Sequence, residues 1–493
     1  MFKALSNIVK GRNSDFELDF FSILPRELSL KILFYLDPKD ILTAEQVCKN
    51  WRFICNDDFL WQEKCKKDQI TLAAENIEID KNKSNEKPLL KRSSTKANNG
   101  IFPSSHWKCR YIRQRRIESN WKSLSIKNSK IINCEYELVS CLRLNAKYIV
   151  SSSYDTKIIN IFLIDSGKCI KKLMGHTDFI TTFYLSEKLI ISGSNDRTLK
   201  IWCIDTGENY RTLLGHTESV RCLTVFENKV ISGSSDCSIR IWNYERGICL
   251  HVLSGHSAAV HCVDYNGIFV ISGSSDKTIK IWHPEGNECV KTLEGHKHEV
   301  KSLQFDGTYV VSGSLDSVRI WDVNTGCLKQ TLLNYKDCFA FTSYSSTEFK
   351  KNLFAFIYFY SPFPYYRVKY EIKVCESATG QCVQILSDPS EESSQVQCIQ
   401  FVLNFVLTSS FGNTIKLWDI KTGKFLRNVI NLNSLKDGYV QKFRATETKL
   451  VCLTEEVHLH QKKFIVINFD TNTSADSKFM KSSSKEKEYC NIV

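Results

Sequence analysis

Histidine, serine and aspartate, the three residue types of a nucleophilic triad, recur in this chain at one fixed spacing. A Gly-His pair returns every forty residues, and each copy is followed by Ser-Gly-Ser-x-Asp and then by Ile-Trp. One such set would suggest a hydrolase, but four copies favour architecture, because a buried His, Ser, Asp and Trp satisfy one another by hydrogen bonds and fix strand register. We interpret as structural, and as neither catalytic nor metal-binding, the residues His176, Ser192, Asp196, Trp202, His216, Asp236, Trp242, His256, Asp276, Trp282, His296, Asp316 and Trp321.

A period of this size predicts a β-propeller, in which each repeat is a blade of four antiparallel strands. The strands expected within one repeat are residues 219–226, 229–233, 238–242 and 248–253. We expect eight blades over residues 131–470, with weaker patterns in the end blades, where the array must close.

Three of these blades depart from the pattern. The first, residues 138–173, has Ile161-Phe162 in place of Ile-Trp, and the eighth is expected over residues 440–469. The sixth keeps a strand at 372–374 and carries an aromatic run, residues 354–366. That run either packs against the neighbouring blades or forms an exposed patch for a partner.

Residues 20–65 predict a small helical module ahead of the repeats. Leu24-Pro25 begins a helix on which Leu28, Ile32 and Leu36 share one stripe, and two further short helices follow. Such a module is too small to hide all of its apolar side chains, so we expect the remainder to bind a partner.

Composition limits where the protein works. Of the 493 residues 42% are apolar, yet no run approaches the ~20 residues of a membrane span. The N-terminus has no segment suited to secretion, and the twenty cysteines lack C-x-x-C spacing, which favours small buried hydrophobes. We expect a protein of the nucleus or cytoplasm that needs no cofactor.

The net charge of +12 is concentrated in one segment. Residues 81–130 hold 14 Lys and Arg against two acidic residues, which equals the whole excess, so we expect no nucleic-acid-binding face on the repeats. Residues 66–106 predict a polar linker in which 87–92 is either a nuclear signal or a plain charged loop. Residues 107–130 predict a connecting helix that acts as a spacer, the alternative being a basic helix that touches RNA or a membrane surface.

The helical module resembles the F-box, which docks on the Skp adaptor of cullin-RING ubiquitin ligases. The resemblance rests on Leu24-Pro-x-Glu-Leu28, Ile32-Leu33, Leu36-Asp37-Pro38, Val47-Cys48-Lys49-x-Trp51 and Leu60-Trp61. The alternative is an unrelated three-helix bundle. By resemblance, the residues expected to contact the adaptor are Leu24, Pro25, Leu28, Ile32, Leu36, Val47 and Trp51.

Taken together, an F-box, a connecting helix and eight WD40 blades resemble the substrate receptors of SCF ubiquitin ligases, above all the branch that recruits phosphorylated cyclin E and Notch. The resemblance implies an α+β multidomain chain, all-α in the F-box and all-β in the propeller. It also implies a non-catalytic receptor that binds a phosphorylated or acidic degron for ubiquitination and proteasomal degradation. The alternative is a WD40 interaction scaffold whose degron pocket has decayed.

The resemblance also implies where substrate binds, because this family reads phosphates with arginines around the central channel. Two of those arginines are kept, at Arg197 and Arg221, while two others fall on Ser235 and His261. Aromatic positions of the family surface fall on Thr181, Ser275 and Lys301. The expected binding residues are Arg197, Ser219, Arg221, Ser235, His261 and Lys301.

The segments outside these parts, residues 1–19 and 471–493, are expected to be polar tails. In the family the dimerisation helices precede the F-box, and with some twenty residues here we do not expect dimerisation by that route. Cys490-Asn491-Ile492-Val493 has the spacing of a prenylation signal, but Asn491 fits it poorly, so lipidation is not expected either.

Overall fold

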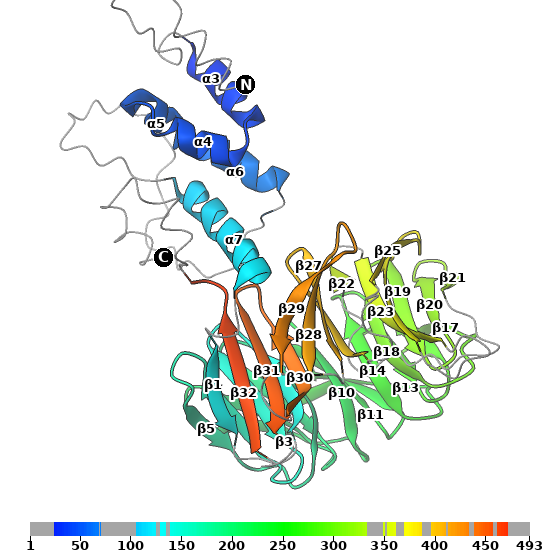
Figure 1. The fold of residues 1–493 in the computed structure, drawn as a ribbon. Coiled ribbons are helices and arrows are strands. Elements are labelled where there is room, and N and C mark those ends of the chain that lie inside the picture. The colour runs from blue at the N-terminus through cyan, green and yellow to red at the C-terminus, as the bar shows by residue number, and fades with distance from the viewer. Residues whose placement is uncertain are drawn as a thin grey trace, which may run out of the picture. The chain divides into compact units, whose positions relative to one another are not determined.

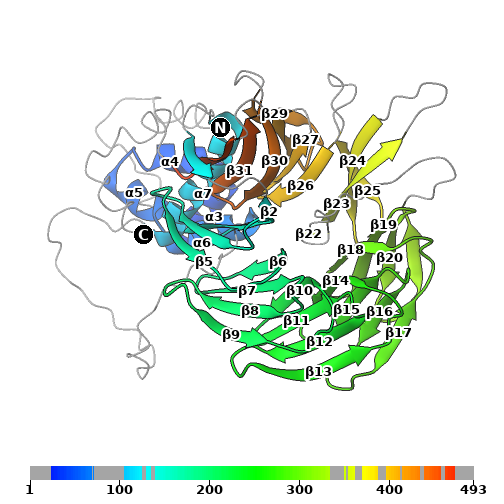
Figure 2. The ribbon, with the colours of Figure 1, turned by 90° about the horizontal axis from the view of Figure 1, so that it is seen from below.

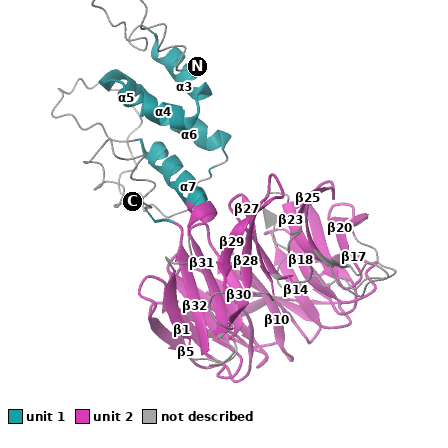
Figure 3. Cartoon of the chain, viewed as in Figure 1, with its two compact units in different colours: residues 1–119, 470–493 teal, residues 120–469 magenta. Residues whose placement is uncertain are grey.

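The computed structural model of the chain describes residues 24–68, 70, 105–124, 129–134, 139–332, 349–350, 353–360, 369–386, 396–410, 413–432, 438–456 and 461–471. The chain divides into two compact units, residues 1–119 with 470–493 and residues 120–469 (Figure 3). The segments predicted as tails, apart from Thr471, lie outside the described residues. The charged segment 87–92 and Cys490 lie outside them too.

The first unit is helical (Figure 1). Its helices are α3 Arg26–Tyr35, α4 Pro38–Ala44, α5 Lys49–Cys55, α6 Asp58–Lys67 and α7 His106–Ser123, the last of which runs into the second unit. Three of the four short helices were predicted. The fourth, α6, begins where the Asp57 carboxylate accepts a hydrogen bond from the Phe59 backbone N–H at 2.9 Å. Its Trp61 is fully buried and lies against Tyr111 of α7, with ring centroids 5.4 Å apart.

The basic side chains of α7 form ion pairs within the first unit. The pairs are Lys108 with Glu45, Arg113 and Arg116 with Asp470, and Arg115 with Asp68 and Glu118. These carboxylates neutralise much of the charge that suggested a nucleic-acid or membrane contact, which weakens that alternative. The helix ends at Ser123 rather than at residue 130, because Lys130 is already in a strand. Among the described helices, none combines the length and apolarity needed to cross a bilayer.

The second unit is a ring of eight four-stranded antiparallel sheets within the described residues, which confirms the predicted propeller (Figure 2). Its first sixteen strands are β1 Lys130–Cys134, β2 Val139–Leu144, β3 Tyr148–Ser153, β4 Ile159–Leu163, β5 Cys169–Leu173, β6 Ile180–Leu185, β7 Leu189–Ser194, β8 Leu199–Cys203, β9 Asn209–Leu213, β10 Val220–Phe226, β11 Lys229–Ser234, β12 Ser238–Asn243, β13 Ile248–Ser254, β14 Val260–Tyr265, β15 Val270–Ser274 and β16 Ile279–Trp282. The other sixteen are β17 Cys289–Leu293, β18 Val300–Phe305, β19 Tyr309–Ser314, β20 Val318–Asp322, β21 Leu328–Thr331, β22 Phe349–Lys350, β23 Leu353–Tyr360, β24 Lys369–Glu376, β25 Cys382–Leu386, β26 Val396–Val402, β27 Phe405–Ser410, β28 Thr414–Asp419, β29 Phe425–Asn431, β30 Gly438–Ala445, β31 Lys449–Glu456 and β32 Gln461–Asn468.

The ring is closed by a strand from its own beginning. Seven sheets use four consecutive strands, but the eighth has the order β1-β32-β31-β30, with Lys130 opposite Val466 and Cys134 opposite Lys462. The eighth blade was predicted from residues 440–469 alone, so its outermost strand, β1, was missed. Closure of this kind removes the free edge between the two ends of the array.

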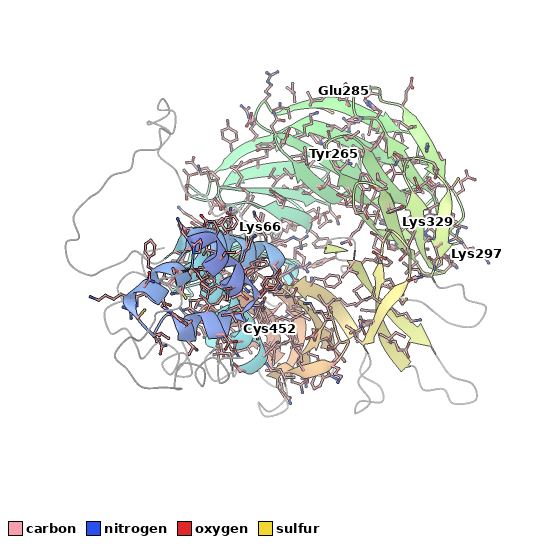
Figure 4. The ribbon with its side chains drawn as sticks, turned by 90° about the horizontal axis from the view of Figure 1, so that it is seen from above. Lys66, Tyr265, Glu285, Lys297, Lys329 and Cys452 are labelled. Atoms are coloured by element: carbon pink, nitrogen blue, oxygen red, sulfur yellow. The ribbon has the colours of Figure 1, made fainter. Side chains whose placement is uncertain are left out.

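Neighbouring blades bury apolar side chains against one another. In one cluster Ile271 and Ile279 of one sheet pack with Val300 and Trp321 of the next. The first strand of each blade is innermost, and Figure 4 shows Tyr265, at the end of β14, nearer the middle of the ring than Glu285, which lies in the turn before β17. The outward order of strands therefore fixes which residues face the central channel.

The repeated polar residues form one buried network in each of four blades. In the sheet β14–β17, His256 Nδ1 contacts Asp276 Oδ2 at 2.7 Å and His256 Nε2 contacts Ser272 Oγ at 2.8 Å. Trp282 Nε1 donates to the same Ser272 Oγ at 2.8 Å. The serine hydroxyl is completely buried, so it offers no nucleophile to a substrate.

Electrostatics reinforces these networks. Burial acts to raise the pKa of Asp196, but hydrogen bonds from His176 and Thr198 outweigh it and hold that pKa well below its usual range. Burial lowers the pKa of His256 and of His296, so these rings are neutral and accept from serine through Nε2. The networks of the four blades are thus fully paired, as predicted for structural residues.

The blades without the full pattern use other groups. In the seventh blade Trp418 Nε1 donates to Thr408 Oγ1 at 2.9 Å, and in the first Phe162 takes the place of the tryptophan. In the sixth, Phe354 and Phe356 are buried in a cluster shared with the fifth blade. For these two residues packing is therefore the correct alternative, while residues 361–366 lie outside the described part of the chain.

Removing the central hydroxyl of one network should destabilise the propeller. Ser272→Ala leaves Trp282 Nε1 and His256 Nε2 buried without partners, and we expect the free energy of unfolding to fall by about 2–4 kcal/mol. Ser302→Ala is the matched control, because Ser302 Oγ has no hydrogen-bond partner among the described residues. Urea denaturation measures the free energy of unfolding of both variants. Equal losses of stability would contradict a stabilising role for the network.

The glycine between the two serines should resist substitution for a different reason. A Cβ on Gly273 would lie 2.6 Å from Val300 Cγ1 and 2.7 Å from Cys262 Sγ, the sulfur of a half-buried residue. We expect Gly273→Ala to cost roughly 1–3 kcal/mol through overpacking between blades. Gly286→Ala, where the nearest atom is 4.0 Å away, should leave the thermal unfolding midpoint unchanged. A Gly273 variant as stable as this control would refute the close approach.

Candidate functional site

One end of the propeller gathers the predicted binding residues. We call this end the rim: it comprises the segments 179–181, 219–221, 259–261 and 299–301, where innermost strands begin, and the adjacent turns 195–197, 235–237, 275–277 and 315–317. Backbone hydrogen bonds join the first three segments to their turns, as from Ser235 N–H to the Ser219 carbonyl at 2.9 Å. All six predicted residues lie on this rim.

Three of them occupy a backbone irregularity that the sequence did not reveal. In the sheet β10–β13, the pairing of the first and second strands shifts by one residue between Val220 and Cys222. The same shift occurs in each of the next two blades. The residues at these shifts are Arg221, His261 and Lys301. A β-bulge leaves its extra residue unpaired and re-aims the side chain, so these three form a series at matching positions on adjacent blades.

Arg221, Ser219 and Ser235 lie together. Arg221 Nε donates to Ser235 Oγ at 2.7 Å, which orients the guanidinium while the side chain stays exposed. No described residue accepts from its two terminal nitrogens. A fixed guanidinium beside two hydroxyl side chains suits one phosphate group, which binds guanidinium bidentately.

His261 and Lys301 lie in a second cluster, with Ser275 and a residue that was not predicted, Glu299. His261 Nε2 contacts Ser275 Oγ at 2.7 Å, Lys301 Nζ at 3.3 Å and Glu299 Oε2 at 3.6 Å. Lys301 also forms an ion pair with Glu299. Nothing in the sequence pattern marks Glu299, because it occupies a variable position of the Gly-His loop.

The charge of this second cluster is lower than predicted. Burial, and then the neighbouring Lys301, lower the pKa of His261, so the ring is neutral at pH 7. The hydrogen bond from Lys301 lowers the pKa of Glu299, which is therefore ionised. One cation and one carboxylate cancel within this cluster, whereas Arg221 forms no ion pair among the described residues.

The remaining predicted residue, Arg197, is not joined to these clusters. It lies exposed in the turn between β7 and β8 with a backbone φ of +71°, and no described residue accepts a hydrogen bond from its side chain. Thr181, where the family has an aromatic residue, turns its hydroxyl to the Gly193 and Val220 carbonyls at 3.0 and 2.6 Å. The rim thus has one candidate anion site, at Arg221, rather than a continuous clamp.

The helical unit presents a second candidate surface. Leu28, Ile32 and Val47 expose 46%, 38% and 60% of their surface, although the core around Leu33 and Trp61 is filled. Of the other residues predicted to contact an adaptor, Pro25 is exposed, whereas Leu24, Leu36 and Trp51 are half-buried. Three exposed apolar residues were not predicted: Tyr35, Phe53 and Phe59. Apolar side chains left outside a complete core mark a binding face.

In the described part of the chain, the His, Cys, Asp and Glu side chains form no group of three or more that could hold a metal ion. The rim instead presents hydroxyl groups and cations, which can form hydrogen bonds and ion pairs.

Known families match both units. The F-box-like family matches residues 21–67, and the WD domain, G-beta repeat, matches residues 167–203, 207–243, 247–283, 287–322 and 380–419. The repeat matches leave out the first, sixth and eighth blades in whole or part, whereas the seventh, which also lacks the full polar network, is matched through its first three strands.

Individual proteins are similar over part of the chain. The F-box/WD repeat-containing protein 7 of Drosophila melanogaster is 42% identical over 172 residues, 35% of this chain and 12% of that protein. The probable E3 ubiquitin ligase complex SCF subunit sconB of Arthroderma otae is 29% identical over 165 residues, 32% of this chain and 24% of that protein. The matched segments therefore span a quarter or less of these relatives.

Among solved structures, the crystal structure of the computationally designed Ika8 protein is similar to 68% of this chain and 99% of its own, with a TM-score of 0.57 and 26% identity. This chain thus combines an F-box-like module with WD40 repeats, and the relatives to which it is similar include F-box/WD-repeat proteins.

Proposed function

We propose that this protein is the substrate-recognition subunit of an SCF-type ubiquitin ligase. The observation that carries the proposal is that one chain holds both an apolar face outside a filled F-box-like core and an anion site on a propeller rim. The first suits an adaptor of the Skp type, and the second suits a substrate. The names of the relatives, one of them an SCF subunit, support the same conclusion.

In this role the protein is a receptor and transfers no group itself. Its contribution is to hold the substrate beside the conjugating enzyme of the ligase, which raises the effective concentration of the acceptor lysines. The buried serines of the blades have no part in that chemistry.

The substrate feature that the rim suits is a phosphorylated segment. A phosphoserine or phosphothreonine carries close to two negative charges and three acceptor oxygens, which match the exposed nitrogens of Arg221 and the hydroxyls of Ser219 and Ser235. An acidic side chain is a weaker ligand for the same groups, because a carboxylate carries one charge.

Charge on the apolar face should abolish adaptor binding. Leu28→Glu and Val47→Glu each bury a carboxylate in the proposed interface, so we expect at least a tenfold loss of affinity for a Skp adaptor, on the order of 1.4 kcal/mol. Ile268→Glu, at a residue 60% exposed on the propeller, is the matched control and should bind as wild type. Co-purification followed by titration measures the effect. Unchanged adaptor binding by both F-box variants would reject the docking proposal.

Reversing the charge of Arg221 should remove phosphopeptide binding. We expect Arg221→Glu to lower the affinity for a phosphothreonine peptide at least ten times more than it lowers the affinity for the same peptide without phosphate. Arg246→Glu makes the same charge change in the β12–β13 turn, at the other end of the same blade, and should have little effect. Fluorescence anisotropy at a fixed salt concentration measures the dissociation constants of both peptides for each variant. Equal binding by the two variants would favour the alternative, a scaffold whose pocket has decayed.

A further inference from the structure

The rim residues fall into columns that can be compared blade by blade. The position just before the first residue of each innermost strand, which is Ile180, Val220, Val260 or Val300, is occupied by Phe179, Ser219, Ala259 and Glu299 in four successive blades. In the third blade this column contributes Ser219 to the anion site, and in the fifth it places a carboxylate. Among these four blades, the column therefore has its acidic residue, Glu299, two blades away from Arg221.

Glu299 is held where it shields the neighbouring cation. It pairs with Lys301 and lies 3.6 Å from His261 Nε2, and its side chain remains 45% exposed. Its pKa is lowered by Lys301, so it carries its charge throughout the physiological range. The groups that would otherwise attract a second phosphate are Lys301 and His261, and both are already engaged.

A phosphate brought to this part of the rim would meet a fixed negative charge. To reach Lys301 it must displace Glu299, which leaves that carboxylate unpaired beside the phosphate, and like charges at such range repel. His261 offers little compensation, since its lowered pKa keeps the ring neutral. By contrast, Arg221 forms no ion pair with a carboxylate among the described residues, so a phosphate there has no such pair to break.

We propose that Glu299 is a specificity-determining residue that restricts the rim to singly phosphorylated segments, with the phosphate at Arg221 and a neutral or basic residue over the His261–Lys301 cluster. This inference rests on the proposed function, and it narrows the substrate class. Discrimination arises from a repulsive element against the wrong ligand rather than from a new contact to the right one.

The test compares three synthetic peptides of one sequence: one with a single phosphothreonine, and two with a second phosphothreonine placed a few residues before or after it. For the full chain bound to its adaptor we expect neither doubly phosphorylated peptide to bind more than about twofold tighter than the singly phosphorylated one. In Glu299→Gln, one doubly phosphorylated peptide should gain about tenfold or more, because Lys301 becomes available, while the singly phosphorylated peptide changes less than about twofold.

Glu285→Gln is the matched control. It makes the same charge change in the turn between β16 and β17, at the opposite end of the blade from Glu299, and it should alter none of the three dissociation constants. The proposal is overturned if wild type prefers a doubly phosphorylated peptide about tenfold, or if Glu299→Gln leaves the ratios as they are. In either case the proposed function stands, provided that Arg221→Glu still weakens the singly phosphorylated peptide. Absence of binding by every phosphopeptide would reject both proposals.

Discussion

The buried serine hydroxyl in each of four blades is the interaction on which the rest of the propeller depends. It receives the indole N–H of a tryptophan on the third strand and meets a histidine from the loop that precedes the first strand, as Ser272 does with Trp282 and His256. One atom therefore ties the outer part of a blade to the segment that enters the rim. Because the aspartate holds the other ring nitrogen, the loop has a single arrangement, and the bulge residue that follows it has a fixed place.

Residues that hold a blade together and residues on the rim are only a few positions apart along the chain. His256 belongs to the buried network, and His261, five positions later, faces the rim. The ring of His256 is fixed by contacts with three neighbours. His261 lies at a β-bulge, where the pairing of the strands does not restrict which side chain can be present. The rim can thus acquire a cation at Arg221 or a carboxylate at Glu299 without any change to the blades.

Sequence patterns predicted the parts of this protein that repeat or that follow a local rule. The blades with His, Ser, Asp and Trp, the four strands of the repeat at residues 219–253 and the first three helices of the F-box-like module were predicted correctly. The features that were missed depend on distant partners: β1 joins the last blade through Lys130 and Val466, and Arg113 pairs with Asp470. Glu299 was missed for another reason: it is important because of its ion pair with Lys301 at the neighbouring bulge, and an ion pair leaves no periodic pattern in the sequence.

The closure of the ring by β1 has a consequence for how the chain is made. Lys130 leaves the ribosome long before Val466, its partner, and at ordinary rates of translation the interval is on the order of tens of seconds. Throughout that time β1 has no strand to pair with, and the finished blades expose an edge that only the final residues cover. Contacts of such high sequence separation form slowly, so the ring stays open until β32 has been synthesised and has paired with β1.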